Sequence, residues 1–335
     1  MSVLARRPSC QGRAARASHP VFAWAARAGA PAGPSGQPQA SSSAPAAAST
    51  RAPAGQLSRR YLFALAGGVA LLGGLPGGSL LGPGRALAAG PVLPSPEVKA
   101  AIDKAMAKAI QKGKCPTALR LVFHDAGTFS AAARDGGVNA SIQYELDRPE
   151  NFGLKRGWRL IEQMRDDLKG TPAEGVVSEA DLIALAGAFA VRLCGGPDIA
   201  VPIGRPVAAA GGADPAGRMP SEKAGAEELK ANFAAKGFTV QELVVLSGAH
   251  TLGSKGFGDA TTFDNEYFRA LLRKPWLDPK EPMREMIGLP SDHVLPEDPD
   301  CLPYIKTYAE DQAAFFRDFS VAYVKMCSLG VPGWA

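Results

Sequence analysis

The composition of this chain changes abruptly near residue 89. Residues 1–88, here called the leader, contain nine Arg and no Lys, Asp or Glu, and residues 20–55 consist largely of Ala, Pro, Gly and Ser. Such a segment has too few patterned apolar residues to bury a core. Any globular fold must therefore be built from residues 89–335, which are enough for one large domain.

The charge balance changes at the same point. Without the nine Arg of the leader, 28 of the 37 basic residues remain against 32 acidic ones, so the net charge falls from +5 to −4. A nucleic-acid-binding surface needs Lys and Arg clustered on one face. We therefore expect no nucleic-acid partner for the body of the chain.

The leader resembles two targeting signals in series. Residues 1–57 have the Arg-rich, acid-free composition of a plastid transit segment, for which no folded structure is expected. Residues 58–88 start with paired Arg59 and Arg60, continue through a Gly-rich apolar stretch and end in Ala86-Leu87-Ala88. That order is typical of a twin-arginine export signal followed by a cleavage site.

A membrane anchor is the alternative for the apolar stretch, since residues 61–82 are long enough to span a bilayer. The repeated Gly, one Pro and the cleavage motif that follows favour a removable signal instead. Crossing two membranes in series predicts the chloroplast thylakoid lumen as the destination. We expect no stable membrane anchor after processing.

The body of the chain has the periodicity of a mainly α fold. Apolar residues recur at three and four positions, as in DLIALAGAFAVRL (181–193), and β-type alternation is scarce. The expected helices are 96–112, 117–129, 152–168, 178–191, 222–235, 239–249, 264–273 and 310–328.

Two segments carry candidate chemistry. In LRLVFHDAGTF (119–129), the residues Arg120, Phe123 and His124 lie on one face of a helix. A core His beside a snorkelling Arg is the plain alternative. However, the apolar helix of QELVVLSGAHTLGSKGFG (241–258) also ends with a His, His250, and only three His follow the leader. Two such placements favour a shared pocket.

Six segments of the body follow one another in the order found in a known protein family. The segments are LRLVFHDAGTF, GGPDIAVPIGR (195–205), LSGAHTLG (246–253), TFDNEYF (262–268), LPSD (289–292) and YAEDQAAFFRDF (308–319). Together they resemble plant-type haem peroxidases of the ascorbate peroxidase branch, and with the leader they resemble its thylakoid-lumen group. The resemblance implies a two-lobed helical domain over residues 89–335, with a haem b slot between a distal and a proximal helix.

On the distal side, the resemblance makes His124 the base that moves a proton between the two oxygens of hydrogen peroxide. Arg120 would stabilise the charge that develops as the O–O bond breaks. Asn151 and Glu145 match the family's distal hydrogen-bond chain. Phe123 occupies a position that is usually Trp in the ascorbate branch.

On the proximal side, the resemblance makes His250 the axial ligand of the haem iron. Asp292 would accept the second ring N–H of that histidine and so fix its tautomer. Asp292 lies in a Pro-bounded segment, so an ordinary turn Asp is the alternative.

The chain also departs from the branch. The loop after His250 is about ten residues shorter than in the branch, and no Trp lies between His250 and Trp276. The Arg used for ascorbate is missing, and Lys255 lacks the planar fork of a guanidinium. Thr251 and Asp264 match two positions of a cation site whose remainder is lost with the loop. Ascorbate use, haem retention and the cation site are all placed in doubt.

Two classes of function follow. One is a haem peroxidase that reduces hydrogen peroxide with a small electron donor. The other is a non-catalytic lumenal protein that keeps the fold and binds a photosystem-associated partner or a small ligand. A metal hydrolase is disfavoured, because two distant His without a carboxylate cluster give too few ligands. Cys115, Cys194, Cys301 and Cys327 form no CxxC pair, which is typical of buried thiols.

We predict that the mature protein begins near Ala89, because a cleavage-like motif and the acid-free leader both end there. Mass spectrometry of the protein isolated from its compartment should find its first peptide at about this residue. Peptides from residues 20–60 in that mature form would contradict the prediction.

Overall fold

The computed structural model describes residues 90–276 and 287–334, all of which belong to one compact unit. The predicted transit segment and export signal lie outside the described residues. No helix in those two ranges combines the length and the apolar character that a bilayer span requires.

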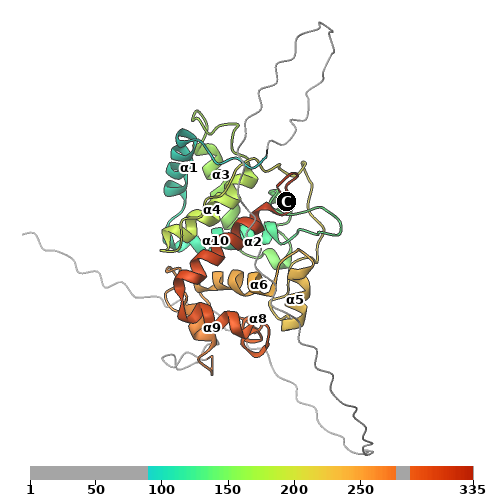
Figure 1. The fold of residues 1–335 in the computed structure, drawn as a ribbon. Helices are drawn as coiled ribbons and strands as arrows, with labels where there is room; N and C mark the ends of the chain where they lie inside the picture. The colour runs from blue at the N-terminus through green and yellow to red at the C-terminus, as the bar shows by residue number, and fades with distance from the viewer. Residues whose placement is uncertain (1–89, 277–286, 335) are drawn as a thin grey trace, which may run out of the picture. The chain divides into compact units, whose positions relative to one another are not determined.

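The fold is mainly α-helical, as the periodicity predicts (Figure 1). Across the described ranges, β structure is limited to two isolated bridges, Val92 with Ile203 and Ser130 with Asp135. The α-helices are α1 (Pro96–Ala109), α2 (Cys115–Ala126), α3 (Lys155–Asp167), α4 (Glu179–Leu193), α5 (Ala226–Ala234), α6 (Val240–Ser247), α7 (Glu266–Leu271), α8 (Pro290–His293), α9 (Leu302–Glu310) and α10 (Gln312–Ser328).

The first lobe is formed by helices α1 to α4. Helix α4 begins with a capping box, in which Ser178 and Asp181 each accept a hydrogen bond from the other's main-chain N–H. Its Ala-rich face packs along α2, and Gly187 allows the close approach. A Cβ at Gly187 would overlap the hydroxyl of Tyr323 and come within 2.8 Å of Val122 Cγ1. The smallest side chain is therefore required where α2, α4 and α10 meet.

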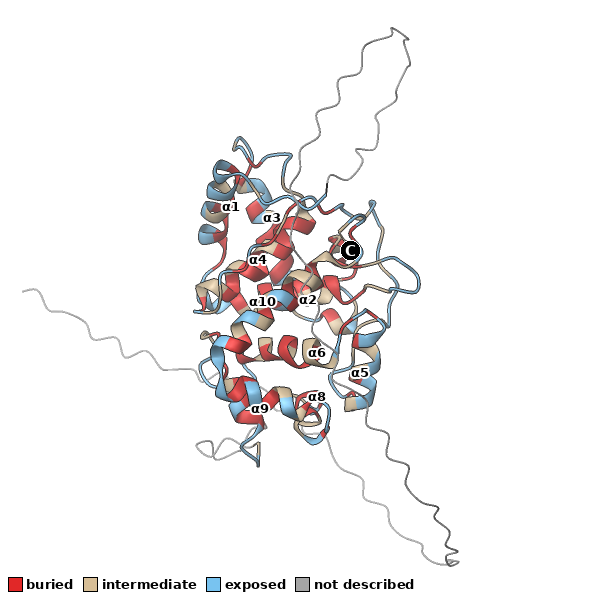
Figure 2. Cartoon of the chain, viewed as in Figure 1, coloured by how far each residue is buried: buried red, intermediate tan, exposed pale blue. Residues whose placement is uncertain are grey.

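The second lobe contains α5, α6, α7 and α9, and its core is aromatic. Phe263 and Phe315 stack with centroids 5.3 Å apart, and Phe268 meets Phe315 edge to face at 5.0 Å. Figure 2 shows the resulting pattern, in which buried residues lie on the inward faces of the helices and exposed residues on the outer faces. Helix α10 contacts α2 of the first lobe and α6 and α9 of the second. It therefore joins the two lobes.

A buried ion pair secures the first lobe against α10. Arg205 Nη1 lies 3.0 Å from Asp181 Oδ1, and both side chains are almost fully buried. Arg205 Nε also donates to the carbonyl of Cys327 at the end of α10, and its guanidinium lies over the ring of Trp334. Arg205 Nη1 also donates to the carbonyl of Pro202, whereas the buried Nη2 has no hydrogen-bond partner among the described residues. Removing either member of the pair would leave a buried charge unpaired.

Several predicted helix boundaries are wrong. The expected helix 310–328 is interrupted at Asp311, whose extended backbone and side-chain oxygen cap α10 by accepting from Ala314 N–H. Helix α9, just before it, was not predicted, because its nine residues follow a Pro- and Asp-rich stretch. Asp292 lies on the four-residue helix α8 instead of in a loop.

We expect Gly187→Ala to lower the free energy of unfolding by about 1–3 kcal/mol, because the added methyl group overpacks the junction of three helices. Urea denaturation followed by circular dichroism measures this. Gly113→Ala is the matched control, since a Cβ there meets no atom within 4 Å. Equal stability of the two variants would contradict the packing argument.

Candidate active site

Helix α2 carries the distal residues, and the loop after it fixes the orientation of His124. The Nδ1 atom of His124 lies 2.7 Å from Oδ1 of Asn151, whose amide nitrogen donates to the main-chain carbonyl of Glu145 at 2.9 Å. Because the amide oxygen of Asn151 can only accept, His124 carries its proton on Nδ1. Its Nε2 is left as a free base.

Glu145 contributes to the hydrogen-bond chain of His124 through its main-chain carbonyl. Its carboxylate accepts hydrogen bonds from Arg148 and from the backbone N–H of Asp214, at 2.9 and 2.8 Å. The structure brings Glu145 and Asn151 together as the resemblance implies. The charged group of Glu145, however, points to neighbours other than Asn151, so its carbonyl alone supports the chain to His124.

Asp125, the residue after His124, holds this loop in place. Its buried carboxylate accepts from the N–H groups of Ala140 and Ile142 at 2.9 and 3.0 Å. Burial raises the pKa of Asp125 to about 7 against these two hydrogen bonds, which lower it. The sequence signal for this support is the acidic residue directly after the candidate base.

Arg120 is held by the same distal loop. Its guanidinium donates to the carbonyls of Glu150 and Phe152 at 2.7 and 2.8 Å. Burial lowers the pKa of Arg120, and the nearby Glu222 carboxylate opposes that shift. Residues 145–152 therefore support both distal groups, His124 through Asn151 and Arg120 through two carbonyl oxygens.

The proximal histidine lies just beyond α6, on a short 3-10 turn (Gly248–Thr251). His250 Nδ1 lies 2.8 Å from Asp292 Oδ1, and the same oxygen accepts from the hydroxyl of Tyr267 at 2.9 Å. The other oxygen of Asp292 accepts from Leu289 N–H at 2.7 Å. Asp292 is thus a buried acceptor with three donors, and not an ordinary turn residue.

Tight packing fixes the position of this turn. A Cβ at Gly248, two residues before His250, would come within 2.6 Å of the ring of Phe315 and 2.8 Å of the ring of Phe268. Only glycine fits there without displacing the aromatic core. The direction of the His250 side chain is therefore set by the packing of the second lobe.

The two imidazoles have opposite electrostatic environments. Burial and the positive charge of Arg120 lower the pKa of His124 to about 4, and the hydrogen bond with Asn151 opposes this. Burial also lowers the pKa of His250, but the Asp292 carboxylate more than offsets it and raises that pKa above its usual value. At neutral pH, His124 is uncharged and ready to accept a proton.

Positive charge acts on both imidazoles. Arg120 lowers the pKa of each, although burial is the larger influence on both. The side chain of His250 is 40% exposed. Lys255 adds a second positive charge near His250.

This donor set fits a haem group. Each imidazole has its Nδ1 occupied, and neither Nε2 has a hydrogen-bond partner in residues 90–276 and 287–334. An imidazole with a carboxylate behind it is a suitable axial iron ligand. Lys255 places a positive charge near His250, which suits a cofactor that carries carboxylates.

The two cation-site positions bond to each other. The hydroxyl of Thr251 donates to Asp264 Oδ1 at 2.8 Å. No group of three or more His, Cys, Asp or Glu side chains suited to a metal ion occurs in the part of the chain that the structure describes.

Comparison with known proteins identifies the family. A profile described as "Peroxidase" matches residues 98–260. The chain is 48% identical to "Putative L-ascorbate peroxidase 6" of Arabidopsis thaliana over 237 residues, covering 70% of this chain and 69% of that protein. This chain belongs to the ascorbate peroxidase branch of the haem peroxidases.

Two further relatives extend the match. This peroxidase is 37% identical to "Probable L-ascorbate peroxidase 3, peroxisomal" of Oryza sativa subsp. japonica, over 70% of this chain and 79% of that protein. It is 35% identical to "L-ascorbate peroxidase 1, cytosolic" of Oryza sativa subsp. indica, over 70% and 95%. The predictions of family and of a mainly helical fold are therefore confirmed, and the family implies haem as the cofactor.

We expect Asp292→Asn to lower the free energy of unfolding of the haem-free protein by about 2–4 kcal/mol, because buried donors lose their charged acceptor. Chemical denaturation measures this. Asp147→Asn is the control, since that carboxylate is 93% exposed and pairs with the exposed Lys155. A loss no larger than that of the control would show that Asp292 does not organise the proximal side.

Proposed function

We propose that this haem peroxidase reduces hydrogen peroxide at the expense of a small donor other than ascorbate. The observation that carries the proposal is the pair of imidazoles, each with Nδ1 fixed by a side-chain oxygen and Nε2 without a hydrogen-bond partner among the described residues. Haem bound in this slot would supply the redox chemistry that these side chains lack. His250 would hold its iron from the proximal side.

His124 and Arg120 perform the distal proton chemistry in this proposal. The neutral Nε2 of His124 takes the proton from one oxygen of the peroxide and returns it to the oxygen that leaves as water. Asn151 keeps the imidazole in the tautomer that makes this possible. Arg120 stabilises the negative charge on the leaving oxygen, and its two carbonyl contacts hold it near His124.

The doubt about ascorbate rests on the segment after His250. The relatives named above are ascorbate peroxidases by name, but this chain has Lys255 in a shortened loop and no Arg there. Losing one charge-assisted anchor weakens the binding of an anionic donor by about 1.5–3 kcal/mol. That corresponds to a loss of about ten- to a hundredfold in donor efficiency.

Tyr267 is our candidate for holding an oxidising equivalent, since no Trp lies between His250 and Trp276 in the sequence. Its ring packs edge to face against His250 with centroids 6.1 Å apart. Its hydroxyl donates to Asp292, and burial raises its pKa far above the usual value, so the phenol stays protonated. The Asp292 carboxylate is placed to receive that proton if Tyr267 is oxidised.

The alternative is a non-catalytic lumenal protein that binds a photosystem-associated partner or a small ligand. It is supported by the shortened loop, which removes groups that would hold the cofactor's carboxylates and the donor. The leader supports the thylakoid lumen as the location for either function, although relatives of this chain carry peroxisomal and cytosolic names.

Titration of the purified protein with haemin tests the proposal directly. We expect a Soret band in the wild type and a weaker, shifted band in His250→Ala, because the axial ligand is removed. Stopped-flow mixing with hydrogen peroxide should then change the spectrum, with faster turnover of guaiacol than of ascorbate. A Soret band without a peroxide response would favour the binding protein, and fast ascorbate turnover would show that another anion site exists.

The pH dependence of the peroxide reaction should follow His124. Its pKa of about 4 places the acid limb of the rate near pH 4, since the base form is lost only below that value. Arg120→Gln removes a positive neighbour, so the limb should move to higher pH while the rate falls. An acid limb near the ordinary histidine value of about 6.5 in the wild type would contradict this assignment.

A further inference from the structure

A second loop lies against the loop that supports the distal histidine. Residues 206–225, here called the crossing loop, lead from the first lobe to α5 without forming a helix. The crossing loop is rich in Ala, Gly and Pro, so it has few large apolar side chains with which to pack. It is held by hydrogen bonds to the distal loop, residues 127–154 between α2 and α3. One of them runs from the N–H of Ala208 to the carbonyl of Asn139 at 2.7 Å.

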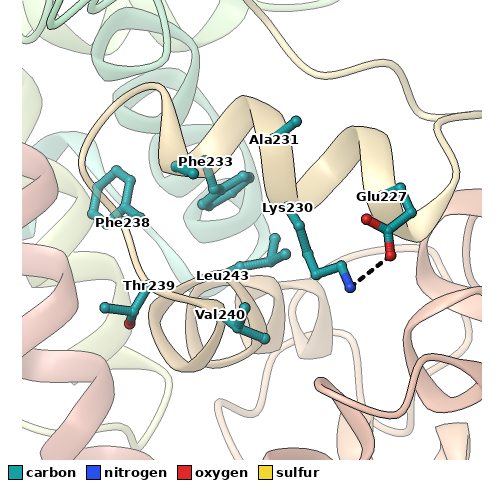
Figure 3. A pocket seen from close by; sticks show the side chains of 9 residues that line it. Glu227, Lys230, Ala231, Phe233, Phe238, Thr239, Val240 and Leu243 are labelled. Atoms are coloured by element: carbon teal, nitrogen blue, oxygen red, sulfur yellow. Dashed lines mark ion pairs between the residues drawn. The ribbon is translucent and has the colours of Figure 1, made fainter.

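The far end of the crossing loop is fixed by the second lobe. The carbonyl of Arg218 accepts from the side-chain amide of Asn232 at 3.2 Å and from Nζ of Lys236 at 2.9 Å. Asn232 belongs to α5, and Figure 3 shows α5 beside α6, with Phe233 and Leu243 between the two helices. The packing of α5 on α6 therefore holds this end of the loop.

The carboxylate of Asp214 holds the middle of the crossing loop. Its Oδ2 accepts from the hydroxyls of Thr128 and Ser141 at 2.7 and 3.0 Å, and the amide of Asn139 donates to both carboxylate oxygens at 3.3 Å. The Thr128 hydroxyl has one proton and also lies 2.7 Å from the carbonyl of Asp125, but the charged acceptor forms the stronger hydrogen bond. Three positions of the distal loop thus converge on one side chain.

The main chain of Asp214 reaches the residues that support the distal base. Its N–H donates to the carboxylate of Glu145 at 2.8 Å, and its carbonyl accepts from Arg148. These two side chains form an ion pair at 2.9 Å. Their carbonyls both accept from Asn151, at 2.9 Å from its side-chain amide and at 3.0 Å from its N–H. A hydrogen-bonded path therefore runs from Asp214 to Asn151, the partner of His124.

The position of Asp214 has an electrostatic cost. Burial raises the pKa of Asp125, and the negative charges of Glu145 and Asp214 raise it further. Three carboxylates in one neighbourhood repel one another, and hydrogen bonds must offset that repulsion. The donors that converge on Asp214 supply those bonds.

We propose that Asp214 is a positioning residue that keeps the proton of His124 on Nδ1. Its carboxylate fixes the crossing loop against the distal loop, and its main-chain groups then hold Glu145 and Arg148 where both support Asn151. The inference rests on the proposed function, because it names the group that keeps the base of that reaction in place.

The tautomer of His124 in the haem-free full chain tests the proposal without any activity. Heteronuclear NMR of the imidazole nitrogens at neutral pH should find the proton on Nδ1 in the wild type. In Asp214→Ala the share of that form should fall to about half, because Asn151 is no longer held against the ring. Asp214→Asn keeps one acceptor oxygen for the hydroxyls of Thr128 and Ser141, so its tautomer ratio should lie between the two.

Asp135→Ala is the matched control. Asp135 is 49% exposed and pairs with Arg218 of the same crossing loop at 2.7 Å. Its loss weakens the hold on the crossing loop at a point away from Glu145 and Arg148. We therefore expect the wild-type tautomer of His124 in this variant.

The haem-loaded proteins give a second measurement. Asp214→Ala should slow the reaction with hydrogen peroxide by about tenfold at pH 7, because a base in the wrong tautomer cannot accept the proton. The Soret band on haemin titration should stay as in the wild type, since the proximal side is unchanged. Asp135→Ala should react at the wild-type rate.

Two results would overturn the positioning role. One is an Asp214→Ala protein that is less stable than the wild type but keeps its His124 tautomer, and the other is an equal tautomer change in Asp135→Ala. If Asp214→Ala does not fold, Asp214→Asn decides by the same criterion. A changed tautomer together with no peroxide response in the wild type would instead refute the proposed function and leave the support of His124 by Asp214 standing.

Discussion

The structure depends on carboxylates that are buried away from water and must be satisfied by the protein itself. Asp125, Asp181 and Asp292 are each at most 1% exposed. A charge in such surroundings is tolerated only when donors surround it. Asp125 and Asp181 each accept main-chain N–H groups from a distant segment, whereas Asp292 accepts from the side chains of His250 and Tyr267 and from the N–H of Leu289. These hydrogen bonds tie loops that carry few apolar residues to the helices.

These buried carboxylates explain how a packed helical fold can hold two histidines in fixed orientations. Asp125 secures the loop that presents Asn151 to His124, and Asp292 secures the turn that presents His250. The pKa values of the two histidines are shifted in opposite directions: burial and Arg120 lower that of His124, whose partner is a neutral amide, whereas the Asp292 carboxylate outweighs burial and raises that of His250. The shortened segment after His250 changes what surrounds the site but leaves both of these supports in place.

The sequence predicted the parts of the site that depend on spacing. Arg120, Phe123 and His124 share a helix face because they are three and four residues apart, and no tertiary information is needed to see this. Parts that depend on distant contacts were not predictable. The hydrogen bond from Tyr267 to Asp292 and the anchoring of the distal loop by Asp125 join residues that are far apart in the sequence, so only the fold reveals them.

Local conflicts explain the errors in element boundaries. Asp311 lies inside a stretch with helical periodicity. Its short side chain accepts a hydrogen bond from the main-chain N–H of Ala314, so one helix ends before Asp311 and the next begins after it. Glu145 is a second case, at the site itself. The resemblance assigned a role to its side chain, but the group that accepts the hydrogen bond from Asn151 is its main-chain carbonyl. Spacing alone cannot distinguish these two uses.

Helix α10 couples the supports of the two histidines. It is the last helix of the described residues, and it contacts α2 in one lobe and α6 and α9 in the other. Helix α2 carries His124, and α6 leads into the turn that carries His250. A change that displaces α10 would therefore disturb the distal and proximal sides together.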